Sequence, residues 1–112
     1  MSRRSRSGII AKRAPVFAAL GDETRLSLVA KLCGGRPRSI SQLTKGSRLT
    51  RQAITKHLRV LERTEIVRSV RTGRENFFEF NPRPIEEIKS YLELVAEEWD
   101  QALGRLKAFV EG

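Results

Sequence analysis

The chain has 112 residues, with 22 Lys or Arg against 13 Asp or Glu, so it is expected to form one domain whose net charge of +9 favours a polyanion as partner. Its 39% apolar and 31% charged residues are typical of a globular protein, and no run of 18 apolar residues is present, which excludes a transmembrane helix and a membrane partner. The single cysteine, Cys33, excludes an intrachain disulfide and favours a reducing, cytoplasmic location.

The first 13 residues form a basic leader with five bases and no acid. This leader is rich in Arg and Ser at its start, so residues 1–13 are expected to form a flexible N-terminal arm. Residues 14–112 are expected to form a single domain for DNA binding and dimerisation. A mitochondrial transit peptide is the alternative, since such peptides have a similar composition. The apolar residues from Ile9 to Leu20 have the spacing of a helix face, which is expected to end at Gly21.

A second helix is expected after this glycine. Asp22 is a suitable N-cap, because its carboxylate can accept hydrogen bonds from the free amides of the first turn. The residues expected to form its inward stripe are Leu26, Val29, Leu32 and Cys33. On this stripe Cys33 is interpreted as a small buried apolar residue in preference to a reactive thiol.

A helix-turn-helix is predicted next. Pro37 and Ser39 open a short helix, residues 45–49 form a turn, and Thr50 caps a longer helix over residues 50–63. Projection of the longer helix at about 100° per residue separates an apolar face from a basic face that has almost no acid.

The basic face of the longer helix suits the major groove of DNA. There Arg and Lys bond guanine, Gln pairs with adenine and the Thr methyl contacts thymine. The residues in the first half of the helix, which usually reaches base edges, are Arg51, Gln52, Thr55 and Lys56. Arg59 and Arg63 lie farther along and are expected to contact phosphates. An ordinary amphipathic surface helix is the alternative, and the scarcity of acidic partners for these Arg and Lys residues weighs against it.

Residues 66–71 and 75–80 are expected to form two strands of a hairpin, because they are rich in branched and aromatic side chains. Gly73 lies at the turn, with Arg71 and Arg74 near the tip. A basic hairpin beside such a helix is a wing that contacts the DNA backbone or the minor groove. A hairpin that only closes the core is the alternative, and both can hold. The residues expected to contact double-stranded DNA are Arg48, Thr50, Arg51, Gln52, Thr55, Lys56, Arg59, Arg71 and Arg74.

Pro82 and Pro84 are expected to begin a final helix. From Ile85 to Phe109 its apolar residues recur in steps of three and four, which is a continuous heptad seam wider than a small domain can cover. A second copy of the chain is therefore expected to pack on the seam and on the first helix; a helix that folds back on its own domain is the alternative. The residues expected at the dimer interface are Phe17, Leu20, Ile88, Leu92, Val95, Trp99, Leu103 and Leu106.

Two segments carry a family resemblance: residues 19–26 (ALGDETRL) and residues 49–61 (LTRQAITKHLRVL). Together with Gly73 and Arg74 in the hairpin, they resemble the ArsR/SmtB family of bacterial winged-helix repressors over residues 14–112. The resemblance implies a mostly α winged helix-turn-helix with a small β-hairpin, in the order α-α-α-α-β-β-α. It also implies a homodimer, built on the first and last helices, that binds an inverted repeat and blocks transcription, often of its own operon. By position, the residues that correspond to the family's base-reading stretch and wing arginine are Arg51, Gln52, Thr55, Lys56 and Arg74.

The chain departs from the metal-sensing members of that family. Where they place a Cys-x-Cys pair on the third helix, this chain has Ser39 and Ser41, and its last helix contains no His. Soft and borderline metals require thiolate or imidazole ligands, which the isolated Cys33 and His57 cannot supply as a tetrahedral set. Neither a metal nor a cofactor is therefore expected, and the ending around Trp99 is similar to a metal-independent branch. An unknown small-molecule effector stays open, and His57 is expected to be a core-edge or hydrogen-bonding histidine.

Enzymatic activity is not expected, because the sequence has no Gly-rich phosphate loop, no Ser/His/Asp set and no nucleophile beside a base. Two alternatives to a sequence-specific regulator are a non-specific nucleic-acid-binding or architectural protein and a winged-helix module that binds protein or RNA. Gln52 and Thr55 favour sequence reading, because a coating surface has no use for amide and methyl groups at groove depth. The sequence leaves open the operator, repression against activation, and the role of the arm.

Overall fold

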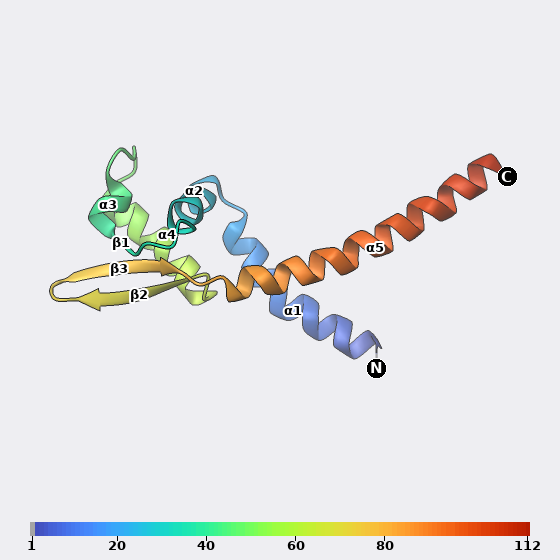
Figure 1. Ribbon diagram of the computed structural model, residues 1–112, viewed down its shortest axis with the longest axis horizontal. Helices are drawn as coiled ribbons and strands as arrows, with labels where there is room; N and C mark the ends of the chain where they lie inside the picture. The colour runs from blue at the N-terminus through green and yellow to red at the C-terminus, as the bar shows by residue number, and fades with distance from the viewer. Residues whose placement is uncertain (1) are drawn as a thin grey trace.

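The computed structural model of the chain describes residues 2–112, with side chains from residue 8 onward. Among these residues the helices are α1 (Ser2–Leu20), α2 (Glu23–Leu32), α3 (Ile40–Thr44), α4 (Arg51–Arg63) and α5 (Arg83–Glu111). The strands are β1 (Arg38–Ser39), β2 (Val67–Thr72) and β3 (Glu75–Phe80), as Figure 1 shows. The prediction of a mostly helical fold with a β-hairpin wing is confirmed.

The N-terminal segment differs from the expected flexible arm. Residues 2–13 are the first part of α1, which continues to Leu20 without a boundary near residue 13; Met1 lies outside the described residues. An ion pair between Arg13 and Glu87 joins this part of α1 to α5. The helix therefore has a tertiary contact that the composition of the segment does not reveal.

Polar side chains fix the starts of three helices. Asp22 Oδ2 accepts from the backbone N–H of Arg25 at 3.0 Å, and Thr50 Oγ1 accepts from that of Ala53 at 3.1 Å, which confirms both predicted caps. Ser39 caps α3 in a reciprocal arrangement, because its hydroxyl accepts from the backbone of Gln42 and the Gln42 side chain accepts from the backbone of Ser39. The start of α4 is thus set locally, which determines where its first turn lies.

The hydrophobic core lies where the first four helices meet the sheet and the beginning of α5. From α4 it takes Ile54, Leu58 and Leu61, each at most 1% exposed, as the predicted apolar face requires. Phe78 of β3 packs into the same cluster. Because these side chains are fully buried, α4 cannot rotate about its axis without opening the core.

The predicted buried stripe of α2 is wrong in its phase. Leu28, Val29 and Leu32 are buried, whereas Leu26 is 53% exposed and Cys33 is exposed. The buried face is turned toward Leu28, and Cys33 lies at the C-cap, beyond the last helical turn. The interpretation of Cys33 as a core residue is therefore corrected.

The sheet has three strands in the order β1-β3-β2, all antiparallel. The hairpin register pairs Thr72 with Glu75, so the turn consists of Gly73 and Arg74. Gly73 has a φ of 63°, a backbone conformation that residues other than glycine rarely adopt. It occupies the first turn position, as glycine does in type II′ turns. The two-residue strand β1, which pairs with Phe77 and Phe78, was not predicted.

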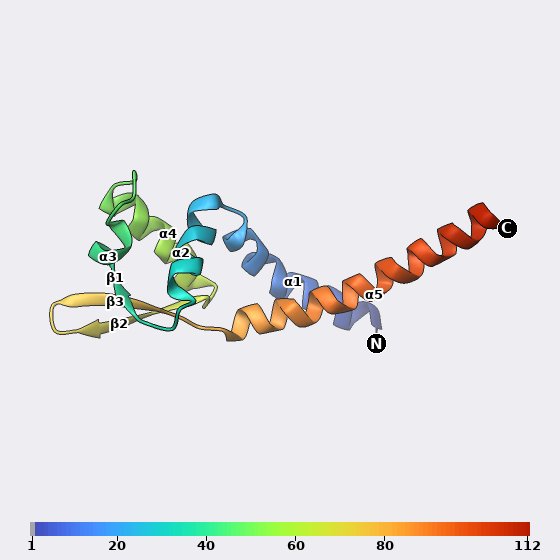
Figure 2. The same ribbon diagram turned by 45° about the horizontal axis from the view of Figure 1, so that its top comes forward.

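The last helix leaves the domain (Figures 1 and 2). Near its beginning α5 packs on α1, where the ring of Phe17 meets the ring of Tyr91 edge-on at a centroid distance of 6.1 Å. From residue 96 to residue 112 every residue is exposed, and the projection makes the molecule 66 Å long. None of the described helices is both long enough and apolar enough to cross a membrane.

Candidate nucleic-acid interface

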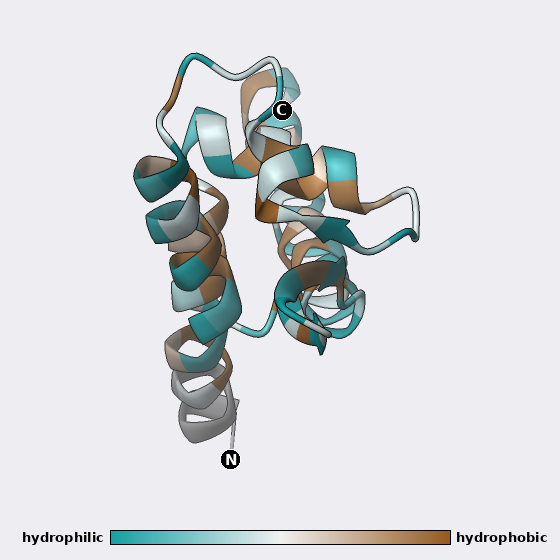
Figure 3. Ribbon diagram, turned by 90° about the vertical axis from the view of Figure 1, so that its left-hand side faces the viewer, coloured by the Kyte–Doolittle hydropathy of each residue, from teal (hydrophilic) through white to brown (hydrophobic). Residues whose placement is uncertain are grey.

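The helix-turn-helix and the wing lie together at the end of the molecule opposite the C-terminus (Figure 1). Figure 3 looks onto this end and shows α1 running along one side of the other elements. Of the nine residues predicted to contact DNA, Thr55 is half-buried and the other eight are exposed: Arg48, Thr50, Arg51, Gln52, Lys56, Arg59, Arg71 and Arg74. The structure thus presents the predicted residues from one end of the domain.

The outer face of α4 follows from its buried one. With Ile54 and Leu58 locked in the core, Gln52 and Lys56 lie on exposed positions of the first turns. The Thr55 hydroxyl donates to the carbonyl of Arg51 at 2.8 Å. The methyl group of Thr55 is therefore the part of this side chain left for an apolar contact.

The second half of α4 has an acid partner for its basic face. Arg59 forms an ion pair with Glu62 at 2.9 Å, so the expectation that the bases lack acid partners is wrong at this position. Glu62 also accepts from the hydroxyl of Ser69 on β2 at 2.7 Å. The Ser69 hydrogen bond, followed by the hydrogen bond and charge of Arg59, lowers the pKa of Glu62 below its ordinary value. The carboxylate therefore joins α4 to the wing.

The faces of the hairpin follow from its register. Arg71 lies opposite Asn76, and Ser69 lies opposite Phe78, so all four belong to one face of the sheet. Because Phe78 is buried in the core and Ser69 contacts Glu62, this is the face that lies toward α4. Arg71 and Asn76 therefore extend the surface of α4 to the tip of the wing.

A polar cleft of about 110 Å³ separates the start of α4 from the wing. Its lining residues are Ser39, Ile40, Ser41, Arg51, Arg74, Glu75 and Asn76. Within it, Nη1 of Arg51 donates to Oγ of Ser41 at 3.0 Å. The guanidinium of Arg51 is thus held toward α3 and the wing. Sequence reasoning missed Ser41 and Asn76 as site residues, because only the fold brings them beside Arg51.

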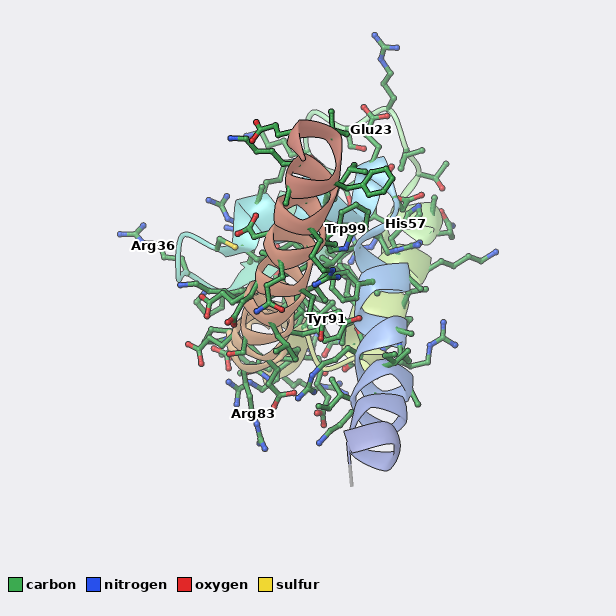
Figure 4. The ribbon with its side chains drawn as sticks, turned by 90° about the vertical axis from the view of Figure 1, so that its right-hand side faces the viewer. Glu23, Arg36, His57, Arg83, Tyr91 and Trp99 are labelled. Atoms are coloured by element: carbon green, nitrogen blue, oxygen red, sulfur yellow. The ribbon has the colours of Figure 1, made fainter. Side chains whose placement is uncertain are left out.

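A second network joins α1, α2 and α4 behind this surface. Nη1 of Arg25 lies 3.2 Å from Nδ1 of His57, which is also 3.8 Å from Oδ2 of Asp22. Arg25 donates as well to the carbonyls of Ala18 and Ala19 at 3.3 and 2.5 Å. The backbone hydrogen bond from Arg25, together with the nearby charge of its guanidinium, lowers the pKa of Asp22. His57, labelled in Figure 4, is thus a hydrogen-bonding residue at the edge of the core, as predicted.

The projecting helix exposes most of its predicted seam. Trp99 is 65% exposed, Leu106 58%, Leu103 55% and Leu92 49%. A shallow apolar hollow adjoins the seam and is lined by Ile85, Ile88, Lys89, Leu92, Glu93 and Ala96. Figure 4 shows Tyr91 and Trp99 on the side of α5 that faces α1. These side chains form an apolar surface along α5, and contiguous exposed apolar surface is typical of an interaction site.

Four of the predicted interface residues are less exposed within the single chain than the rest of the seam. Ile88 is only 6% exposed and belongs to the core, so it has little surface left for a second chain. Phe17, Leu20 and Val95 are half-buried, with Phe17 against Tyr91 and Leu20 against the core.

Ser39 and Ser41 have local structural roles. Ser39 Oγ caps α3, and Ser41 Oγ accepts from Arg51. Among the side chains that the structure describes, no three His, Cys, Asp or Glu residues gather in a way that could hold a metal ion.

Both the sequence and the structure of the chain are similar to those of known proteins. A family profile described as "Helix-turn-helix domain" matches residues 20–70, which contain α2, α3 and α4. The uncharacterized HTH-type transcriptional regulator YuzN of Bacillus subtilis (strain 168) is 35% identical over 85 residues, which are 70% of this chain and 92% of YuzN.

Solved structures have the same architecture. An ArsR-like transcriptional regulator from Rhodococcus sp. RHA1 superimposes with a TM-score of 0.77 at 37% identity, covering 91% of this chain and 95% of the other. The homodimeric winged helix-turn-helix DNA-binding domain Mb0332 from Mycobacterium bovis superimposes with a TM-score of 0.65 at 18% identity, covering 82% of this chain and 84% of the other. At that identity the second match shows the fold alone.

Proposed function

Because the chain belongs to the ArsR-like winged helix-turn-helix transcriptional regulators, we propose that it is a homodimeric repressor that binds an inverted repeat in double-stranded DNA and controls its own operon. Its relatives are regulators of transcription and not enzymes. The observation that carries the proposal is the orientation of α4, whose apolar side is fixed in the core while its first turns present polar and basic side chains outward.

Base reading is assigned to three side chains of the first two turns of α4, of which Gln52 and Lys56 are exposed and Thr55 is half-buried. Gln52 can bond an adenine edge through its amide, and Lys56 can bond guanine O6 and N7. The methyl of Thr55 can contact thymine, since its hydroxyl is already bonded to the backbone. These three side chains together give the surface a preference among base pairs.

The wing and the flanks of α4 supply contacts to the DNA backbone. Arg71 and Arg74 lie on or beside the hairpin turn, and both are exposed. Arg48 and the N-cap Thr50 lie at the beginning of α4, and both are exposed. Basic and hydroxyl side chains in such places position a protein on DNA phosphates without reading the base sequence. Arg59 keeps a 55% exposed side chain despite its pair with Glu62 and is assigned the same role.

The second copy is assigned to the exposed seam of α5. The large apolar side chains Leu92, Trp99, Leu103 and Leu106 are 49% to 65% exposed in their own chain, and heptad spacing is suited to a partner helix. The homodimer described for Mb0332 has the same fold. A symmetric dimer would place two α4 helices on the two halves of an inverted repeat.

Transition-metal sensing is not part of the proposal. A thiolate or imidazole set is what such metals need, and the described chain offers an exposed Cys33 and a His57 that is bonded to Arg25. The regulator would act in the cytoplasm, where bacterial DNA lies.

Selection of preferred sequences from random duplexes, followed by gel-shift competition, tests the proposal. A selected inverted repeat should compete far better than a scrambled duplex of the same composition. Gln52→Ala should reduce this advantage, whereas the matched control Gln101→Ala, on the exposed far part of α5, should leave it unchanged. Equal competition by both duplexes would support a non-specific DNA-coating protein instead.

A further inference from the structure

We infer that the cleft between α3, the start of α4 and the wing binds one phosphodiester group of the DNA backbone, with Arg51 as a phosphate contact and Ser41 as its positioning residue. This inference rests on the proposed function and deepens it. It assigns Arg51 a role different from the base reading that its place in the sequence predicts.

The path of the DNA strand leads through this cleft. A major groove and the minor groove beside it are separated by one sugar-phosphate backbone. If α4 enters the major groove and the wing reaches the adjacent minor groove, that backbone must cross the space between them. In this chain that space is the cleft that Arg51 and Arg74 share.

The hydrogen bond between Arg51 and Ser41 orients both groups for an anion. A guanidinium has five N–H donors, so Arg51 retains donors after one has bonded Oγ of Ser41 at 3.0 Å. The Ser41 hydroxyl accepts in this bond and so still has its own proton to donate. A phosphate oxygen in the cleft can therefore receive hydrogen bonds from both side chains.

The wing completes the site from the other side. No hydrogen bond or ion pair engages the side chain of Arg74 or Asn76 within the described part of the chain, so both have free donors. Arginine binds phosphate in a bidentate manner, with charge-assisted hydrogen bonds that are stronger than neutral ones. The cleft of about 110 Å³ is open and mainly polar, which suits the oxygens of one phosphodiester.

One lining residue opposes an anion. Glu75 follows Arg74 in the chain and carries no ion pair among the described residues. The two arginines give the cleft a charge of +2, and the carboxylate of Glu75 lowers this net charge to +1. Removal of this charge should therefore strengthen DNA binding, which is a result of opposite sign to the loss of either arginine.

A scan with methylphosphonate duplexes tests the inference. In each duplex one phosphate of the selected operator is replaced by a neutral methylphosphonate, and binding is measured with the wild type, Ser41→Ala and Arg51→Ala. For the wild type, one replacement per half-site, on the strand between the two grooves, should weaken binding about tenfold or more. The two variants should lose most of that effect at the same phosphate and keep the effects at other phosphates.

Controls separate the cleft from general charge. Arg105→Gln removes one charge from the exposed far part of α5 and should keep the full effect at that phosphate. Glu75→Gln should raise affinity for all duplexes. Arg51→Ala should weaken binding to every sequence by a similar factor and leave the selected sequence unchanged.

Two results have different meanings. If Arg51→Ala relaxes the choice of one base pair while every phosphate keeps its wild-type effect, Arg51 reads a base and the inference is overturned, although the proposed function stands. If the wild type has no preferred duplex at all, the proposed function itself fails. The Ser41→Ala chain keeps the test informative should the Arg51 variant fold poorly.

Discussion

Replacement of Trp99 by glutamate should dissociate the proposed dimer. Trp99 is 65% exposed in the single chain and lies at the middle of the seam on α5. Full burial of a large apolar side chain is worth about 1.5 to 3 kcal/mol, so burial of the remaining two thirds gives about 1 to 2 kcal/mol per copy. Two copies contribute about 2 to 4 kcal/mol, which raises the dissociation constant about 30- to 700-fold.

Glutamate adds a further cost, because its carboxylate would lose water on the apolar seam without a partner. The loss should therefore exceed that of Trp99→Ala. Operator affinity should fall with it, since a single copy binds one half-site and gains nothing from the second.

Sedimentation over a range of concentrations measures the effect, with Leu94→Glu as the matched control. Leu94 is 45% exposed on the same helix, but it lies about 200° from Leu92 at 100° per residue and so faces away from the seam. The control should remain dimeric. A Trp99→Glu chain that sediments like the wild type, or a wild type that is monomeric throughout, would refute the argument for the seam.

Three further outcomes are expected. Gln52→Ala should cost about 1 to 3 kcal/mol on the selected operator and relax its base preference, as measured by titration with point-substituted duplexes; a uniform loss on all duplexes would assign Gln52 to the backbone. The double variant Arg71→Ala and Arg74→Ala should lower the slope of log affinity against log salt by about two for each copy, and so by about four for the dimer, and an unchanged slope would remove the wing from the interface. Because the hydrogen bond from Ser69 lowers the pKa of Glu62 in the folded state, its carboxylate stabilises the fold above pH 4.5, and this contribution is lost as the pH falls through the lowered pKa. Urea unfolding should therefore show Glu62→Gln less stable than the wild type at pH 7, with a difference that shrinks below pH 4.5; a constant difference would contradict this origin.

The elements that local chemistry determines were predictable from the sequence. Asp22 and Thr50 cap their helices because a carboxylate or hydroxyl at that position meets free amides three residues on. The strong alternation of apolar and basic positions in α4 likewise set its buried and exposed faces. These signals lie within a few residues of one another, so no knowledge of the fold is needed to find them.

Features that depend on tertiary contacts were not predictable. The strand β1 has two residues, too few for any periodic pattern, and exists because it pairs with Phe77 and Phe78. In α2 either Leu26 or Leu28 could face inward on periodicity alone, and the position of α4 decides for Leu28. Cys33 was misplaced for the same reason.

The candidate site shows the same division. The exposed Arg and Lys side chains of α4 and the wing were predicted from the spacing of charged residues, since each lies on an element with a clear start and end. The residues that orient these side chains were not predicted, because Ser41 is ten residues from Arg51 and Glu62 contacts Ser69 only after the hairpin folds back. Sequence thus indicates which groups can meet DNA, and the fold determines how each is held.

The Arg25 side chain joins α4 to α1 by hydrogen bonds. Its guanidinium is anchored on carbonyls at the C-terminal end of α1, which favours a cation, and it also meets His57 on α4. In a dimer built on α1 and α5, a sliding motion of α4 would have to break these bonds. Half-sites for such dimers are separated by about 34 to 36 Å, one turn of DNA. This rigid internal coupling would make the regulator intolerant of an inserted or deleted base pair between the half-sites, even where every contacted base is intact.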